Sequence, residues 1–344
     1  MDEPARVGYD SAMSELRTTS PVSSRFRHRA GRAALPPWSY KAMLVLAAAI
    51  WGLGTVVVKD TVDALPPFWL VGIRFFFSGI ILLIVCFNVI RAHIDRESLV
   101  AGSFLGIFLV ASYACNTAGL TDTTAAKSSF LTSIYCAFVP FFAWAVSRIR
   151  PTRYNIAAVV LCVAGVGFVS FSDGFETMSL GFGEIITIVS AAFLALHIAF
   201  TAKLSDGRDA LTLTVVQFIV SGVLGCAAGL FIEGMPDWSV LGEPGVFANV
   251  AYIVVFASCI ALSLQNVGVA HVAPAPAALF LATESVFGVI FSVMFLGETV
   301  TALMAVGFVL IGAGIVVSEA LPLKKQRLDA NQVAEEEMRA SEEG

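Results

Sequence analysis

The chain has 344 residues, of which 57% are hydrophobic and 14% are charged, and its mean hydropathy is +0.83. A soluble domain carries about 25% charged residues, so this chain has too few polar side chains to cover a water-soluble globule. The net charge is −5, and the lack of a folded basic domain argues against nucleic acid as a partner.

Polar tails flank a long apolar region. Residues 1–40 are arginine-rich and lack the apolar core of a signal peptide, so we expect a disordered cytoplasmic tail. Ten apolar runs follow, each close to the roughly 17–25 residues that a transmembrane helix needs. Residues 321–344 form a charged cytoplasmic tail. The predicted spans are 42–58, 67–89, 99–120, 128–146, 156–172, 184–203, 211–232, 246–269, 275–296 and 301–320.

Charges in the connectors predict the orientation of these spans. If the N-terminus is cytoplasmic, the cytoplasmic connectors hold most of the basic residues, whereas the opposite connectors are acidic. The basic residues are Arg91, Arg96, Arg148, Arg150, Arg153, Lys203 and Arg208. Positive charge marks the cytoplasmic side, so both termini should be cytoplasmic, which requires an even number of spans. We expect a multi-pass protein of the plasma membrane, with the bacterial inner membrane as its address.

The second half of the chain repeats features of the first. Phe130-Leu131 corresponds to Phe280-Leu281, and Asn116 to Asn266, both at a shift of 150 positions. Ala164-Gly165 corresponds to Ala313-Gly314 at a shift of 149. The repeats would cover residues 41–173 and 181–320, with five spans each. Because five is odd, the second repeat enters the membrane from the opposite side, as in many secondary transporters. The predicted fold is all-α, with ten transmembrane helices as two inverted five-helix repeats.

Several short motifs occur in the same order as in a known family. They include Ala49-Ile50-Trp51-Gly52, Ala118-Gly119-Leu120, Phe130-Leu131-Thr132-Ser133, Leu264-Gln265 and Leu296-Gly297-Glu298. With them the chain resembles the EamA-type, ten-helix branch of the drug/metabolite transporter superfamily, over roughly residues 41–318. The resemblance implies a helical bundle with a central cavity, cytoplasmic termini and export of amino acids or other small metabolites. The chain departs from the family pattern at Ser285, where proline is frequent, and at Val269, where a polar residue is common.

Ionisable residues inside the predicted spans are the first candidates for substrate or ion binding, because a charge in hydrocarbon costs about 2.5–3.5 kcal/mol on insertion scales. Glu284 could bind a substrate ammonium or a coupling proton, or hydrogen-bond to a neighbouring helix. His197 could relay protons or bridge two helices. Arg74 could hold a substrate carboxylate, pair with an acid or extend to the interface. Lys127, at the start of the fourth span, could also bind a substrate, or extend to the interface more easily than Arg74.

Uncharged side chains could line the same path. The candidates are Asn116, Gln217, Gln265, Asn266, Trp51 and Tyr135. For each of them, a hydrogen bond or a packing contact between helices is the alternative role. The cysteines have neither CxxC nor zinc-site spacing, so we expect no metal site and no cofactor.

The leading hypothesis is a secondary active transporter that exports an amino acid or related metabolite by alternating access, coupled to protons. No phosphate-binding loop and no nucleophile–base pair is present, so we expect no enzyme activity. One alternative is uptake or facilitated permeation of a nucleoside, vitamin or sugar derivative. Another is a membrane-embedded enzyme or a scaffold subunit. The expected partners are a small-molecule substrate, protons and the lipid bilayer, with the chain as a monomer or homodimer.

Overall fold

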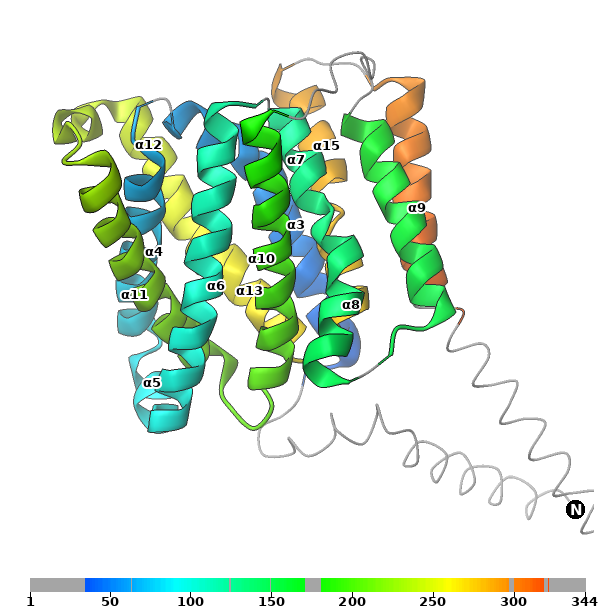
Figure 1. Cartoon of the computed structure of the whole chain (residues 1–344), viewed down its shortest axis with the longest axis horizontal. Helices are drawn as coiled ribbons and strands as arrows, with labels where there is room; N and C mark the ends of the chain where they lie inside the picture. Colours follow the sequence, from blue (N-terminus) through cyan, green and yellow to red (C-terminus); the bar gives the residue numbers. More distant parts are fainter. Residues whose placement is uncertain are drawn as a thin grey trace, which may run out of the picture.

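The computed structural model describes residues 35–62, 64–123, 125–148, 150–170, 181–296, 300–318 and 321, and these residues form a bundle of helices without strands (Figure 1). The tails predicted at 1–40 and 321–344 lie almost wholly outside the described residues. The first half contains α3 (Pro37–Val62), α4 (Pro67–Val85), α5 (Phe87–His93), α6 (Arg96–Thr121), α7 (Ala125–Ser133), α8 (Tyr135–Ser147) and α9 (Arg153–Ser170). The second half contains α10 (Phe182–Leu204), α11 (Ala210–Ala228), η1 (Gly229–Glu233), η2 (Trp238–Gly242), α12 (Pro244–Tyr252), η3 (Ile253–Ile260), α13 (Ala261–Val269), α14 (Pro274–Leu281), α15 (Glu284–Leu296) and a helix over Ala302–Ser318.

Seven helical stretches in the described part of the chain are long and apolar enough to cross a membrane. They are Pro67–Val85, Arg96–Thr121, Phe130–Ser147, Phe182–Leu204, Ala210–Glu233, Pro244–Val269 and Pro274–Phe291. Arg153–Phe168 and Ala302–Ser318 are apolar but shorter. A bilayer can hold a helix because all of its backbone groups are bonded internally. The chain is therefore an all-α, multi-pass membrane protein.

Polar residues mark the ends of several helices. Asp95 accepts a hydrogen bond from the Ser98 amide at 2.7 Å and starts α6, and this bond lowers the pKa of the Asp95 carboxyl. Asp209 starts α11 in the same way through the Thr212 amide at 2.9 Å. The N-terminus of α4 has a more distant partner, because the Glu233 carboxylate accepts from the amides of Phe68 and Trp69. These contacts satisfy N–H groups that have no partner within the helix.

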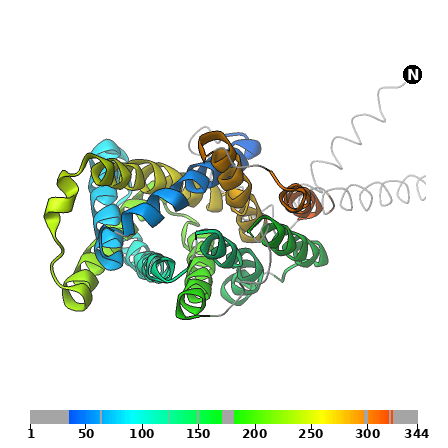
Figure 2. The same cartoon turned by 90° about the horizontal axis from the view of Figure 1, so that it is seen from above.

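The two halves of the chain interlock. α10 packs against α6, α7 and α8, whereas α3 packs against α13, α14 and α15. α4 and α11 lie side by side, and α6 packs against both α10 and α11 (Figures 1 and 2). Small residues permit the closest of these approaches: a Cβ atom on Gly225 would lie 2.7 Å from Gly72 Cα. This is the packing that membrane helices use when lipid already surrounds them with apolar groups.

Two predicted spans are interrupted in the middle. The run predicted at 128–146 breaks at Ile134 between α7 and α8, and the run predicted at 275–296 breaks at Ala282-Thr283 between α14 and α15. The shift of 150 maps Ile134 onto Glu284, the first residue after the second break. Backbone hydrogen bonds continue through both turns, for example from Ile134 N to Leu131 O and from Val286 N to Thr283 O.

Candidate functional site

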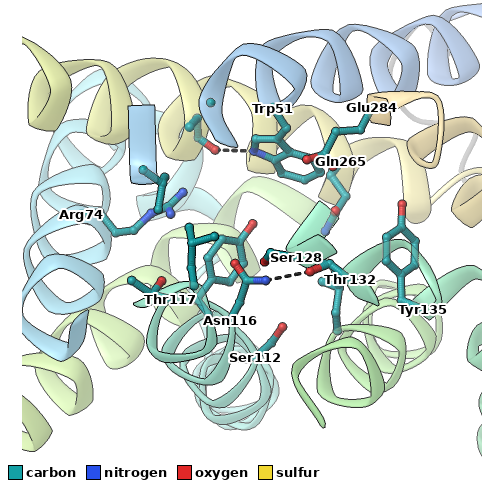
Figure 3. A pocket seen from close by; sticks show the side chains of 16 residues that line it. Trp51, Arg74, Ser112, Asn116, Thr117, Ser128, Thr132, Tyr135, Gln265 and Glu284 are labelled. Carbon is teal, nitrogen blue, oxygen red and sulfur yellow. Dashed lines mark hydrogen bonds between the residues drawn. The ribbon is translucent and has the colours of Figure 1, made fainter. Parts of the chain in front are cut away.

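A cavity of about 90 Å³ lies between the two halves of the bundle (Figure 3). A buried water needs roughly 10–15 Å³ by this measure, so the space holds several waters or part of a small solute. The first half contributes Trp51, Arg74, Tyr113, Asn116, Thr132 and Tyr135, and the second half contributes Leu194, Ala257, Gln265 and Glu284. Ser112, Thr117, Ser128, Gly54, Val58 and Leu120 complete the wall.

Arg74 supplies a positive charge at one side of this cavity. Its side chain is only 4% exposed, and its Nε donates to Ser258 Oγ at 3.0 Å. The guanidinium lies 4.7 Å from the ring centroid of Tyr113, which is a cation–π contact. No carboxylate of a described residue forms an ion pair with Arg74. Of the three roles considered for Arg74, pairing with an acid therefore finds no support in the described part of the chain.

The segment opposite Arg74 is a π-helix, η3, whose i→i+5 bonding differs from that of the flanking α-helix. Two of its carbonyls accept hydrogen bonds from side chains of the first half. Trp51 Nε1 donates to Ala257 O at 2.8 Å, and Ser78 Oγ donates to Val254 O at 2.9 Å. The π-helix thereby fixes the indole of Trp51 as one wall of the cavity and presents Ser258 to Arg74.

Glu284 lies at the helix break, as the first residue of α15. Its side chain faces the cavity together with Trp51 and Gln265 (Figure 3). Tyr113 and Tyr135 line the same cavity as Glu284. Glu284 is the first residue of α15, and the positive end of a helix dipole favours a negative charge at this position.

The amides of the cavity differ in their bonding. Asn116 Nδ2 donates to Thr132 Oγ1 at 2.7 Å and so ties α6 to α7. Gln265 is 1% exposed, and neither polar atom of its side chain has a partner among the described residues. Asn116 therefore has a structural bond, whereas both polar atoms of Gln265 are available to a ligand or water.

Six of the ten residues selected from the sequence line the cavity: Trp51, Arg74, Asn116, Tyr135, Gln265 and Glu284. Three others form a separate buried cluster beside it. His197 Nε2 contacts Gln217 Oε1 at 2.7 Å, and Asn266 Nδ2 donates to Thr214 Oγ1 at 3.1 Å. The side chain of Lys127 lies outside the described residues.

Two residues that matter for the site, Tyr113 and Ser258, were not among the candidates selected from the sequence. Tyr113 is three residues before Asn116 and shares its helix face, so the helical period could have identified it. Ser258 gives no such signal, because it is one of many small residues in an apolar run. Only the fold brings it to Arg74.

Comparisons with known proteins agree with this architecture. The profile of the EamA-like transporter family matches the chain twice, over residues 38–171 and 181–319. An uncharacterized transporter of Archaeoglobus fulgidus is 26% identical over 314 residues, which cover 91% of this chain and 96% of that protein. The uncharacterized transporter YetK of Bacillus subtilis is 27% identical over 85% of this chain and 89% of its own.

Two further matches extend the comparison. The uncharacterized inner membrane transporter YedA of Escherichia coli K12 is 23% identical over 78% of this chain and 87% of its own. A crystal structure with 14% identity matches the fold with a TM-score of 0.68, over 83% of this chain and 97% of that one. The two profile matches together span well over half of the chain, and the named relatives are transporters rather than enzymes. This chain is a multi-pass membrane transporter that belongs to the EamA-like transporter family.

Proposed function

We infer that this transporter moves an amino acid or a related small metabolite by alternating access, as a proton-coupled exporter. The observation that carries this inference is a cavity between the two halves that presents both a buried cation, Arg74, and an acid, Glu284. A solute bound between two halves can be released to either side when the halves exchange their conformations.

The proposed architecture is ten spans in two inverted repeats. The packing pattern supports it, because each contact of α3 has a counterpart in the other half. α3 packs against α13 and the broken pair α14–α15, and α10 packs against α6 and the broken pair α7–α8. α4 and α11, which correspond to each other under the repeat, pack together. A two-fold axis in the membrane plane generates pairs of this kind.

The two charged groups have complementary roles in this proposal. Arg74 holds the substrate carboxylate, because its Nε is engaged with Ser258 and the rest of its planar fork remains for a bidentate contact. Glu284 binds the substrate ammonium when it is ionised and the coupling proton when it is protonated. Substrate and proton then compete for one carboxylate, which is sufficient to couple their movements in opposite directions.

Orientation in the membrane follows from charge and topology. The described ends of the chain, at the start of α3 and the end of the helix Ala302–Ser318, lie at the same end of the bundle (Figure 1). α10 ends there too, with Lys203 in its last turn and Arg208 in the turn that follows. We place this end in the cytoplasm by the positive-inside rule, with the bundle in a bacterial plasma membrane.

The experiment that tests the inference is transport by purified protein in liposomes loaded with a mixed pool of amino acids and metabolites. An imposed pH gradient of either sign should drive net movement of a solute, and the direction identifies export or uptake. In Glu284→Gln the solute should move down its own gradient only. Glu243→Gln is the matched control, because Glu243 is an exposed carboxylate at the start of α12. The inference fails if no solute moves under any gradient.

A further inference from the structure

A buried polar cluster lies beside the cavity, on the side of the described ends of the chain. We define this cluster as His197 and Thr201 on α10, Thr214 and Gln217 on α11, and Asn266 on α13. Each of these side chains is at most 2% exposed. Two residues that line the cavity are close to the cluster in the sequence. Leu194 lies one helical turn before His197, and Gln265 directly precedes Asn266. The polar cluster therefore borders the cavity.

Several atoms of the cluster lack partners. Because Gln217 Oε1 accepts the bond from His197 Nε2, the tautomer that fits leaves His197 Nδ1 as an acceptor. His197 Nδ1, Gln217 Nε2, Asn266 Oδ1 and Thr201 Oγ1 have no hydrogen-bond partner among the described residues. These atoms include both donors and acceptors, contributed by three helices. Buried polar groups are rarely left unsatisfied, and bridging water is the usual solution where donors and acceptors converge.

The packing around the cluster is also unusual. α6 packs tightly against both α10 and α11, whereas α10 and α11 are not a closely packed pair and are linked by the bond between His197 and Gln217. An apolar group formed by Leu105, Leu213 and Phe200 lies beside the cluster, because Phe200 directly precedes Thr201 and Leu213 directly precedes Thr214. The cytoplasmic rim ends in an ion pair between Arg208 and Glu97 at 2.8 Å. From His197 to the end of α10 at Leu204, the barrier is about 10 Å thick at 1.5 Å per residue.

We propose that this cluster is a water-binding inner gate of the transport pathway, which opens the cavity toward the termini when α10 and α11 separate. The inference rests on the proposed alternating access but concerns a different set of residues from the cavity. A gate of apolar side chains alone would expose apolar surface to water on opening. Here the polar atoms that lack protein partners can bind further water when the gate opens, so the closed and open states are brought closer in free energy. A transporter needs such a balance, because a ligand shifts two states only by its difference in affinity for them.

A matched pair of threonines on α10 tests the gate. Thr201→Cys places a thiol in the cluster, and Thr187→Cys places one in the α6–α10 interface, where Thr187 is fully buried and bonds to Gly183 O. A charged, membrane-impermeant thiol reagent is added from the termini side of reconstituted vesicles, under a pH gradient of each sign. Labelling at each position is read by peptide mass spectrometry, which separates it from the native cysteines. Asp206→Cys, in the exposed turn after α10, controls for access of the reagent.

We expect Thr201→Cys to react faster under one sign of the gradient and Thr187→Cys to stay unlabelled. Adding Gln217→Ala removes the bond to His197, which should raise the labelling rate at position 201 about fivefold, the population shift that one net hydrogen bond produces. The proposal is overturned if position 201 stays unlabelled under both gradients while Asp206→Cys reacts, or if positions 187 and 201 react equally. Transport without labelling at position 201 would refute the gate alone. Labelling without any transported solute would refute the proposed function and leave the gate.

Discussion

Gly52 and Gly54 form a natural test of how tightly the cavity wall is built. Both lie on α3, two residues apart. A Cβ atom on Gly52 would lie 2.7 Å from Gly288 N, 2.8 Å from Phe287 Cβ and 2.9 Å from Glu284 O. At Gly54 the nearest atoms would be Tyr252 Cε1 at 3.7 Å and Ala257 Cβ at 3.9 Å, which is ordinary contact. Gly52→Ala must therefore displace α15, whereas Gly54→Ala fits.

The expected magnitude follows from the difference between the two variants. Each gains the same helix propensity, about 0.5–1 kcal/mol for Gly to Ala, so this contribution cancels in the comparison. What remains is the overpacking at Gly52, which typically costs about 1–3 kcal/mol. We expect the free energy of unfolding, measured by denaturing-detergent titration in mixed micelles, to be lower by that amount in Gly52→Ala. Because α15 begins with Glu284, coupling to the pH gradient should weaken as well. Equal stability of the two variants would refute the close approach of α3 and α15.

Three further outcomes are expected. Arg74→Lys keeps the charge but loses the planar fork and the Nε bond to Ser258. The KM of a carboxylate-bearing substrate should therefore rise at least about tenfold in the liposome assay, which is the effect of roughly one charged hydrogen bond. An unchanged KM would exclude the guanidinium as a ligand. Trp51→Phe removes the 2.8 Å bond to Ala257 O and should lower the free energy of unfolding by about 1 kcal/mol. An unchanged free energy of unfolding would show that the π-helix does not depend on this bond. Spin labels can be attached at two exposed positions, Phe77 on α4 and Val223 on α11. The distance between the two labels, measured by electron spin resonance, should be the same under both signs of the pH gradient. A gradient-dependent distance would show that α4 and α11 move apart.

The gross architecture could be predicted because it depends on averages over many residues. Apolar runs of sufficient length identify membrane helices whatever the order of their side chains. Arg74 and Glu284 could also be selected, since a charge in an apolar run is costly enough to require a special environment. The boundaries differ: α3 extends over Pro37–Val62, beyond the predicted 42–58, because its ends carry polar residues that still complete helical hydrogen bonds.

The finer features depend on geometry that periodicity does not encode. Gln265 faces the cavity and Asn266 faces the inner cluster although they are neighbours, because one residue turns a helix by about 100°. The rotation of α13 is set by its packing against α3, which no local pattern reveals. The helix break at Ile134 contains neither glycine nor proline, so its local sequence predicts a continuous helix.

Two kinds of helix contact divide the bundle into parts with different capacities for motion. The α4–α11 contact is made by glycines, and a Cβ atom on Gly72 would meet Cys226 N at 2.5 Å. Such backbone contacts have a single close-packed arrangement and resist sliding, because any shift drives one backbone into the other. Between α10 and α11, His197 bonds to Gln217, and the polar atoms of this pair can exchange partners for water at little net cost. In a membrane, where apolar surfaces gain little by meeting each other, this difference in contact chemistry determines where the bundle can open. In the proposed alternating access, the pair α4–α11 would be the axis about which the two halves move, and the polar cluster beside it would be the place where the bundle opens.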